Sequence, residues 1–404
     1  MAKPKTARWE EKREAILDAA THVLNRNGLS GFRLADVAAQ IGLKRPSIVY
    51  YFANVEELAE ALYARALAQL EERVSHAEQG GDPRECLARL FELELAHHAD
   101  ERAGLAIRRP QLGEIRALSS DRRRGLGRRY HGILERVASM LGKDVCSARL
   151  VEVIAPAQVI METVFWLPAW IDEYETWAFP RLREVLVETL LDGVMAKDTC
   201  ARTPYIPEEP RLERKAIDQD DYLRSATRLI CAMGFRGGGI DRISAELGVT
   251  KGSFYHHINQ KDELIEACFA HSQQRLSAIQ RRAAERDMSP AERLRAVIST
   301  LISIQIEGRF PLLRSSALPA LSADARTKII AQSNRNFRWF ASEIAEGIAN
   351  GEMHSRDPHV SAQVLGAAIN AIFDLPRLYG EGIGAKDVPY CAALLMHGIL
   401  TPPQ

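Results

Sequence analysis

Apolar residues recur at intervals of three and four positions along most of this chain of 404 residues, and that spacing predicts amphipathic α-helices. One such helix covers residues 16–24 and ends at Asn27-Gly28, where glycine can adopt the left-handed conformation of a helix cap. A second helix is expected over residues 34–41. A third is expected over residues 45–51, and Pro46 fits its first turn because no intrahelical hydrogen bond is lost there.

The same pattern occurs a second time without a gap. Ile16 aligns with Tyr222 and Ala61 with Ala267, and the second copy predicts helices over residues 222–233, 240–247 and 251–257. A repeat on this scale is a duplicated domain, because the units of solenoid proteins run to roughly 20–50 residues. The pairs that hold the register include Leu17 and Leu223, Ala20 and Ala226, Gly28 and Gly234, Gly42 and Gly248, and Ser47 and Ser253.

In each copy, two short helices joined by a tight turn containing glycine predict a helix-turn-helix, the motif whose second helix enters the major groove of DNA. The sequences beyond the motifs also repeat, more loosely. Leu167-Pro168 corresponds to Leu375-Pro376, and each half closes on a glycine in an apolar helix, Gly193 and Gly398. The chain is therefore expected to be all-α and to contain two copies of one unit.

The second helix-turn-helix resembles the recognition-helix signature of the tetracycline-repressor (TetR) family. The resemblance rests on residues 248–258, GVTKGSFYHHI, and on Lys261-Asp262-Glu263-Leu264 after them. Residues 42–52, GLKRPSIVYYF, with Glu56-Glu57-Leu58 after them, are a looser version. Known members of the family are all-helical dimers whose first three helices bind DNA and whose remaining helices bind a small molecule and dimerise. The resemblance implies that plan twice in this chain.

The division of the chain follows from the repeat and the resemblance. Helix-turn-helix domains are expected at residues 1–55 and 216–261, and helical ligand-binding and dimerisation domains at residues 56–197 and 262–404. Residues 198–215 contain Pro204, Pro207 and Pro210 and are expected to form an extended linker that spans roughly 55 Å. We expect the halves to pack as an intramolecular pseudo-dimer with heads about 34–36 Å apart. A homodimer of tandem chains, with four heads, is the alternative.

The resemblance also implies DNA-contacting residues, and these differ between the two units. The tyrosine in the middle of the family's recognition helix is kept as Tyr255 but is Val49 in the first unit, and the phosphate-binding lysine is kept as Lys261 but becomes Val55. Because base contacts come from a few side chains of this helix, unequal heads should read an asymmetric pseudo-palindrome. The expected contacts are Arg33, Lys44, Arg45, Ser47, Tyr50, Tyr51, Thr250, Lys251, Ser253, Tyr255, His256 and Lys261.

The distribution of charge along the chain modestly supports DNA binding by the two helix-turn-helix motifs. The net charge is zero, yet residues 1–54 hold nine basic and five acidic side chains, and residues 211–258 hold eight and six. Both motifs therefore lean basic, which is typical of a surface that binds nucleic acid. On charge alone, an ordinary solvated helix face is an equally good interpretation.

The sequence is least informative about the small molecule, which is expected to be largely apolar. An aromatic-rich segment at residues 165–177 has few counterparts in the second half, so any pockets should differ between the halves. Such residues form a core or a helix interface more often than a pocket. Five arginines, at positions 122–124 and 128–129, are interpreted as a solvated helix face rather than a site for an anion such as a coenzyme A ester. The candidate ligand contacts are Phe165, Trp166, Trp170, Phe310 and Phe373.

Signals for other classes of protein are absent from the sequence. It has no Gly-x-Ser-x-Gly, Walker or His-Glu-x-x-His motif, so no enzymatic activity and no cofactor are expected. The pairs His97-His98 and His256-His257 suit joint metal binding poorly, because adjacent residues of a helix point to different faces. Six scattered cysteines predict buried thiols in a reducing compartment. No secretory signal or membrane span is expected, which favours the cytoplasm.

The sequence thus predicts a DNA-binding transcriptional regulator, a repressor that a small molecule releases from its operator. The alternative is a small-molecule sensor or protein-interaction module in which one or both helix-turn-helix units no longer bind DNA.

Overall fold

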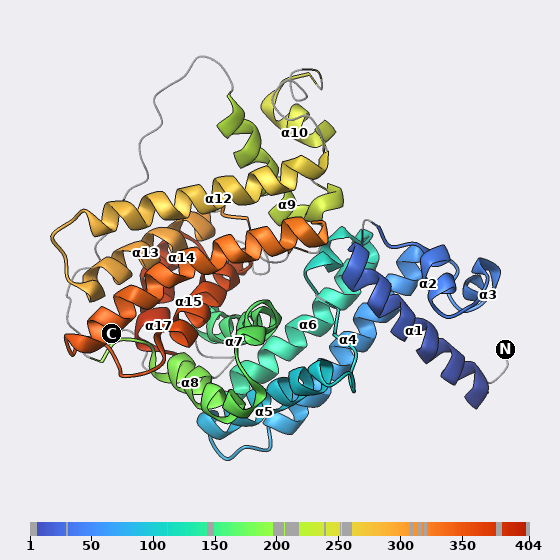
Figure 1. Ribbon diagram of the computed structural model, residues 1–404, viewed down its shortest axis with the longest axis horizontal. Coiled ribbons are helices and arrows are strands. Elements are labelled where there is room, and N and C mark those ends of the chain that lie inside the picture. Colours follow the sequence, from blue (N-terminus) through green and yellow to red (C-terminus); the bar gives the residue numbers. More distant parts are fainter. Residues whose placement is uncertain are drawn as a thin grey trace.

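The computed structural model is an assembly of helices in two halves (Figure 1). It describes residues 6–29, 31–110, 112–143, 149–196, 206, 218–237, 240–250, 252, 261–307, 311–313, 317–318, 321–376 and 382–400. Among these residues there is no strand, and Met195 and Met353 form an isolated β-bridge. The all-α prediction is confirmed. The expected linker, residues 198–215, lies outside the described residues except for Ile206, which is buried.

The first half begins with a small three-helix domain, which we call the first head. It consists of α1 (Ala7–Asn27), α2 (Leu34–Gln40) and α3 (Arg45–Val49). The helical body that follows contains α4 (Val55–Ala77), α5 (Pro83–Arg102), the 3₁₀ helix η1 (Leu112–Ala117), α6 (Ser120–Met140), α7 (Leu150–Trp166) and α8 (Phe179–Asp192). Three short 3₁₀ helices connect α7 with α8, namely η2 (Leu167–Ala169), η3 (Ile171–Glu173) and η4 (Thr176–Ala178).

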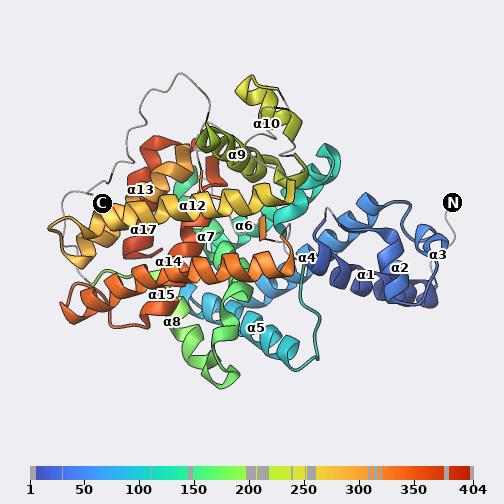
Figure 2. The same ribbon diagram turned by 45° about the horizontal axis from the view of Figure 1, so that its top comes forward.

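The second half repeats this order. The described part of its helix-turn-helix unit, which we call the second head, contains α9 (Gln219–Gly237) and α10 (Ile240–Leu247). Its body contains α12 (Lys261–Ala284), α13 (Pro290–Glu307), α14 (Ala323–Ala349), α15 (Pro358–Ile372), η7 (Ala385–Asp387) and α17 (Val388–His397). In Figures 1 and 2 the first head projects from one end of the molecule, whereas α9 lies beside α12.

The periodic apolar positions of the heads fold as their spacing predicts. The apolar face of α1 is buried, and Gly28 ends the helix with a φ of 63°. Gly42, with a φ of 65°, makes the turn after α2. Several boundaries differ from expectation, and α1 begins at Ala7, well before the predicted residue 16. Helix α3 ends at Val49 rather than residue 51, because its last turn tightens into bonds of the 3₁₀ type, and α9 begins earlier than predicted, at Gln219. The helix expected at residues 251–257 lies outside the described residues, apart from Gly252.

The two halves meet where α7 and α8 pack against α15, with α17 beside them. The segment 150–169 is long and apolar enough to cross a membrane, but 83% of its most apolar window is buried by the rest of the protein. Two polar contacts fix the register of this interface. The indole Nε1–H of Trp166 donates to Oε1 of Gln363 at 2.9 Å, and the hydroxyls of Thr189 and Ser361 lie 3.2 Å apart. The most apolar helix of the first half is therefore covered by the second half.

The main chains approach most closely at the glycines that follow α8 and α17. Gly193 and Gly398 have φ angles of 70° and 84°, so they cap these helices rather than lie within them as the sequence suggested. A Cβ on Gly193 would lie 2.5 Å from the amide nitrogen of Gly398. Around this pair, the amide of Val194 donates to the carbonyl of Met396 at 2.9 Å, and the amide of Ile399 donates to the carbonyl of Leu190 at 2.9 Å. Only glycine permits this approach.

Replacing Gly193 by Ala should destabilise the protein, because the methyl group meets the main chain of the other half in addition to the strain of a positive φ. Gly351→Ala is a matched control, since Gly351 has a φ of 72° but no atom within 4 Å of its Cβ position. We expect Gly193→Ala to lower the free energy of unfolding by about 1–3 kcal/mol more than the control does. Urea denaturation measures both losses. Equal losses in the two variants would contradict this close contact.

Candidate functional site

The first head presents a polar surface on α3 and on the turns beside it. Ile48 is fully buried in the core of the head and holds α3 in place, so its neighbours on the helix face outward. Tyr50 is 74% exposed, which is unusual for a large aromatic side chain. The surface combines cationic, hydroxyl and aromatic groups on a rigid support. Its exposed residues are Arg33, Lys44, Arg45, Ser47 and Tyr50.

Tyr51 differs from the other predicted DNA contacts of the first head because it is half-buried. Its ring centroid lies 5.3 Å from that of Trp9 on α1 and 5.1 Å from that of Tyr50, edge to face. Tyr51 therefore supports Tyr50 and joins the end of α3 to α1. Val49, at the position of the family's tyrosine, is 41% exposed.

The second head is described in part. Thr250, just before the expected recognition helix, is exposed. Lys251, Ser253, Tyr255 and His256 lie outside the described residues, as does the side chain of Lys261. Their contacts with DNA stay predictions.

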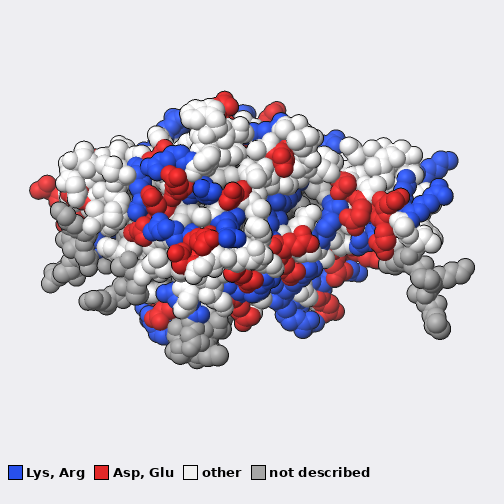
Figure 3. Space-filling model, turned by 90° about the horizontal axis from the view of Figure 1, so that it is seen from below, with Lys and Arg blue, Asp and Glu red and all other residues white. Residues whose placement is uncertain are grey.

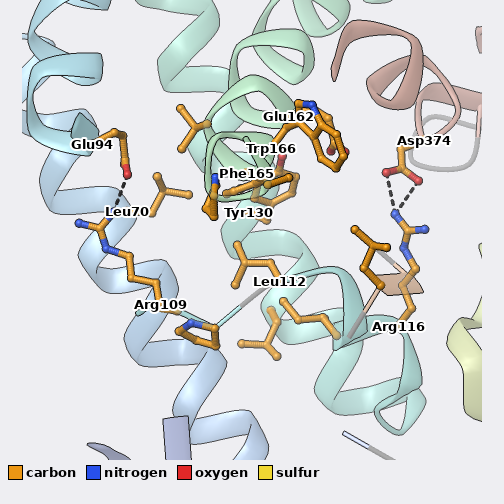
Figure 4. A pocket seen from close by; sticks show the side chains of 18 of the residues that line it. Leu70, Glu94, Arg109, Leu112, Arg116, Tyr130, Glu162, Phe165, Trp166 and Asp374 are labelled. Atoms are coloured by element: carbon orange, nitrogen blue, oxygen red, sulfur yellow. Dashed lines mark hydrogen bonds and ion pairs between the residues drawn. The ribbon is translucent and has the colours of Figure 1, made fainter. Parts of the chain in front are cut away.

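A cavity of about 620 Å³ lies in the body of the first half, a volume typical of sites for small molecules. Its wall is formed by α4, α5, η1, α6, α7 and the segment between α5 and η1 (Figure 4). Four residues of the second half complete it. They are Ala232 and Met233 on α9, together with Leu318 and Asp374. Both halves of the chain therefore build this cavity.

Ion pairs bound the cavity on two sides (Figure 4). On one side, the buried carboxylate of Glu94 accepts hydrogen bonds from Arg73 and Arg109, each at 2.5 Å. Burial lowers the pKa of the Arg73 guanidinium, and the nearby charge of Glu94 opposes that effect. On the other side, Arg116 on η1 donates to both carboxylate oxygens of Asp374 at 2.6 Å. The cavity thus has charged sides around an apolar interior.

Aromatic rings line the interior between these ion pairs. Phe165 and Trp166, both predicted as ligand contacts, lie here with Tyr130 (Figure 4). The ring centroids of Tyr130 and Phe165 are 6.1 Å apart, and the Tyr130 hydroxyl donates to Oε1 of Gln158 at 3.1 Å. A ligand with a flat or apolar body would find its contacts on this surface.

Two of the other candidate ligand contacts, Trp170 and Phe373, do not join this group. Trp170 and Phe373 are fully buried in the hydrophobic core and do not line the cavity, because their rings are covered by neighbouring helices. Phe310 lies outside the described residues. Trp170 and Phe373 are therefore core residues, which is the alternative that the sequence offered to a place in a pocket.

The histidines of α5 form a small polar cluster on the cavity wall. Nε2 of His97 lies 2.8 Å, and Nδ1 of His98 3.3 Å, from the carboxylate of Glu101. Both adjacent histidines reach the same carboxylate, because Glu101 follows one by four residues and the other by three. That they suit joint metal binding poorly stays a prediction. Burial opposes ionisation of Glu101, but the contacts with the two histidines hold the pKa of its carboxyl well below the ordinary range. No group of three or more His, Cys, Asp or Glu that could hold a metal ion occurs in the described parts of the chain.

The arginines of α6 do not act as one surface. Arg122 pairs with Glu60, Arg124 with Asp121, and Arg129 binds Glu71 through two contacts of 2.6 Å. Arg123 instead lines the cavity and donates to the main-chain carbonyl of Arg116 at 3.2 Å. Arg123 is exposed, as a solvated helix face predicts, and it also lies at the edge of the cavity.

The corresponding space in the second half is nearly filled. Between α12, α13, α14 and α15 the cavity measures about 90 Å³, below the usual range for ligand sites. Phe337 and Phe340 both line it. A Cβ on Gly366 would lie 2.6 Å from Cζ of Phe337 and closer still to Cε1, so the aromatic side chain packs directly on the α15 backbone. The expected difference between the halves is present, with the larger cavity in the first half.

Sequence reasoning missed the charged residues of the cavity. Arg116 and Asp374 are 258 positions apart, so no local spacing could pair them. One signal was available. Asp374 precedes Leu375-Pro376 as Trp166 precedes Leu167-Pro168, so a carboxylate stands in an apolar segment where the first half has an indole.

Charges elsewhere are mixed. On the face shown in Figure 3, basic and acidic side chains are interspersed over the helical body. Many form pairs such as Arg136 with Glu78 at 2.6 Å and Arg65 with Asp18 at 2.8 Å. This agrees with a net charge of zero.

The described cysteines are free thiols, as their scattered positions predict. Cys86, Cys231, Cys268 and Cys391 are buried, and burial raises the pKa of Cys268 to about 12. Such thiols stay protonated and act as small apolar core residues. Cys146 and Cys200 lie outside the described residues.

Comparison with protein families identifies the duplicated unit. Residues 16–62 and 223–268 each match the domain of bacterial regulatory proteins of the tetR family. Residues 287–374 match a tetracyclin repressor-like C-terminal domain. The chain belongs to the TetR family. In this TetR protein the two amino-terminal matches fall on the first and second heads, and the carboxy-terminal match falls on α13, α14 and α15.

Similar proteins share parts of this TetR chain. The Transposon Tn10 TetC protein of Escherichia coli is 43% identical over 65 residues, which are 14% of this chain and 33% of that protein. The match thus spans about a third of the relative's length. Apo AibR is 21% identical with a TM-score of 0.36, covering 44% of this chain and 98% of AibR. The Bacillus subtilis regulator FadR in complex with stearoyl-CoA is 22% identical with a TM-score of 0.33, covering 44% and 96%.

Glu94→Gln should destabilise the fold, because two arginines would lose the buried carboxylate that neutralises them. We expect a loss of about 3–5 kcal/mol. Glu92→Gln is the control on the same helix, since Glu92 is an exposed partner of Arg183 and its loss should cost less than about 1 kcal/mol. Chemical denaturation near pH 7 compares the two. A loss at Glu94 as small as that at Glu92 would show that the buried network contributes little to stability.

Proposed function

We propose that this chain is a DNA-binding transcriptional regulator, a repressor that carries two reading heads in one polypeptide. The observation that carries the proposal is the surface of the first head, where exposed Lys44, Arg45, Ser47 and Tyr50 surround the buried anchor Ile48. Cations at such a surface bind phosphates and position the head, while hydroxyl and aromatic side chains reach base edges. The exposed Thr250 supports the same role for the second head.

In this proposal the chain acts as an intramolecular pseudo-dimer. The domains follow the division expected from the sequence, with heads within residues 1–55 and 216–261 and helical bodies within residues 56–197 and 262–404. Packing of α7 and α8 against α15 and α17 supports this arrangement, because it joins the halves through equivalent helices as a twofold dimer would. One chain then offers two heads to one operator, as the two subunits of a helix-turn-helix dimer do.

The two heads should prefer different half-sites. The first head carries an exposed Val49 where the second carries Tyr255, and Val55 where the second carries Lys261. Two different heads cannot both bind their preferred half-site in a perfect palindrome, because its two half-sites are identical. Selection of binding sites from random DNA by the full chain should therefore return two different half-sites in a fixed relative orientation. Recovery of a perfect palindrome would contradict the proposal that the heads read DNA differently.

A small molecule would regulate this repressor by binding in the cavity of the first half. The cavity volume of about 620 Å³ and its aromatic lining suit a largely apolar ligand. The ligand would favour an arrangement of the heads that differs from the DNA-bound one. Such a regulator would act in the cytoplasm, where it meets its operator.

Arg45→Ala should weaken binding to the selected operator by roughly tenfold and reduce the dependence of affinity on salt. The slope of log affinity against log salt should become shallower by about 1 if Arg45 binds a phosphate. Lys251→Ala tests the second head in the same way. Arg335→Ala is the control, because Arg335 is an exposed arginine on α14 that contacts Gln332. Fluorescence anisotropy over a salt series measures all three, and unchanged binding by Arg45→Ala would remove the first head from the interface.

A further inference from the structure

The cavity of the first half is closed in part by the second head. Ala232 and Met233 on α9 line it, although they belong to the helix-turn-helix unit of the other half. Met233 also reaches the next helix of that head, because its Sδ lies 2.8 Å from Nη1 of Arg242 on α10. A molecule in this cavity would therefore touch the second head directly.

Arg116 gives a second connection between the cavity and α9. It lines the cavity from η1, donates to the carbonyl of Cys231 on α9 at 2.9 Å, and pairs with Asp374 at 2.6 Å. Helix α9 also packs along η1. A ligand that displaces the Arg116 guanidinium would thus disturb a contact with the main chain of α9.

The first head has a more remote connection to the cavity. Asn25 of α1 donates to the carbonyl of Arg108 at 2.8 Å, and Arg108 lines the cavity wall. No residue of α1 lines the cavity itself. The second head therefore contributes residues to the cavity wall, whereas the first head contacts that wall through Asn25 and Arg108.

The charges of the wall indicate the chemistry of the ligand. Of five arginines that line the cavity, Arg73, Arg109 and Arg116 are ion-paired with Glu94 or Asp374. Arg108 and Arg123 instead donate to main-chain carbonyl oxygens, those of Pro168 at 3.1 Å and Arg116 at 3.2 Å. Two more carboxylates, Glu101 and Glu162, also line the cavity, and Glu101 is contacted by His97 and His98. Arg108 and Arg123 are exposed, so their positive charge is available to an anion at the edge of the cavity. This lining suits an amphiphile with an apolar body and one anionic group.

We propose that the cavity of the first half is a single shared site for an anionic amphiphile, and that its occupant controls the second head across the interface between the halves. The inference rests on the proposed function, because α9 belongs to a reading head. It goes further by assigning one site per chain, a ligand class and a direction of control. Arg116 acts as a positioning residue that connects the occupied cavity to α9.

The first test uses the full chain and the dye 8-anilinonaphthalene-1-sulfonate, which has an aromatic body and one sulfonate. Wild type should bind one dye per chain. Gly127→Trp should abolish binding, because Gly127 lines the cavity and nothing lies within 4 Å of its Cβ position, so the indole can fill the space. Gly125→Trp is the matched control on α6, with equal room but no place in the cavity wall, and should bind as wild type does. Arg123→Gln should weaken binding roughly tenfold.

The second test measures amide hydrogen exchange with and without the dye. Exchange in α9 should slow or quicken several-fold on binding, while α1 should change less. Arg116→Met is measured at saturating dye, because Arg116 lines the cavity and its loss is expected to weaken binding; with the cavity filled, the response of α9 should still be lost. Arg116→Lys, which keeps the charge, should restore part of it.

Two results would overturn the inference. One is dye binding by Gly127→Trp equal to that of wild type, and the other is a response confined to α4–α7 with α9 unchanged. Neither test involves DNA. A chain that binds no DNA but shows the α9 response would refute the proposed function and leave the shared site intact. A chain that binds DNA but lacks the α9 response would refute the shared site and leave the proposed function intact.

Discussion

The packing of two homologous halves against each other is the constraint on which the rest of the structure depends. Helix α7 is buried almost throughout its length, and much of its cover comes from α15. Removing this apolar surface from water supplies a large stabilising term, since burial is worth roughly 25 cal/mol per Å². Burial of apolar surface is non-directional, so by itself it would allow α7 and α15 to pack in several registers. The glycine pair Gly193 and Gly398 allows the main chains to meet and exchange hydrogen bonds, which fixes one register.

This interface also determines where the cavity lies and what closes it. Because the halves are held in one register, α9 packs along η1 and Asp374 comes within 2.6 Å of Arg116. Both contacts cross from one half to the other. In the second half, Phe337 and Phe340 occupy the equivalent region and leave about 90 Å³. Joining the halves in one chain permits this division of roles, because two identical subunits could not specialise.

Local features of the fold could be predicted from the sequence. The apolar face of α1 and the turns at Gly28 and Gly42 depend on neighbours a few positions away, and the structure contains them as predicted. The end of α3 was less predictable, because the amide of Tyr51 donates to the carbonyl of Ile48, three residues back, and so tightens the final turn. The repeat itself was visible because its two copies align without a gap.

The cavity could be predicted only in part. Phe165 and Trp166 were recognised from aromatic density, yet the same criterion selected Trp170 and Phe373, which are core residues. Periodicity shows that a side chain faces inward but not whether it meets a packed neighbour or a void. The pair of Arg116 and Asp374 depends on a contact between segments 258 positions apart. Such a contact is specified by the packing of the halves and not by any local pattern.

We propose that one chain places two unequal heads on one operator. The most direct measurement is footprinting of the full chain on DNA flanking its own gene, with the mass of the complex determined alongside. We predict protection of two unequal half-sites by a single chain. Protection that requires two chains, or no protection even at low salt, would contradict the claim.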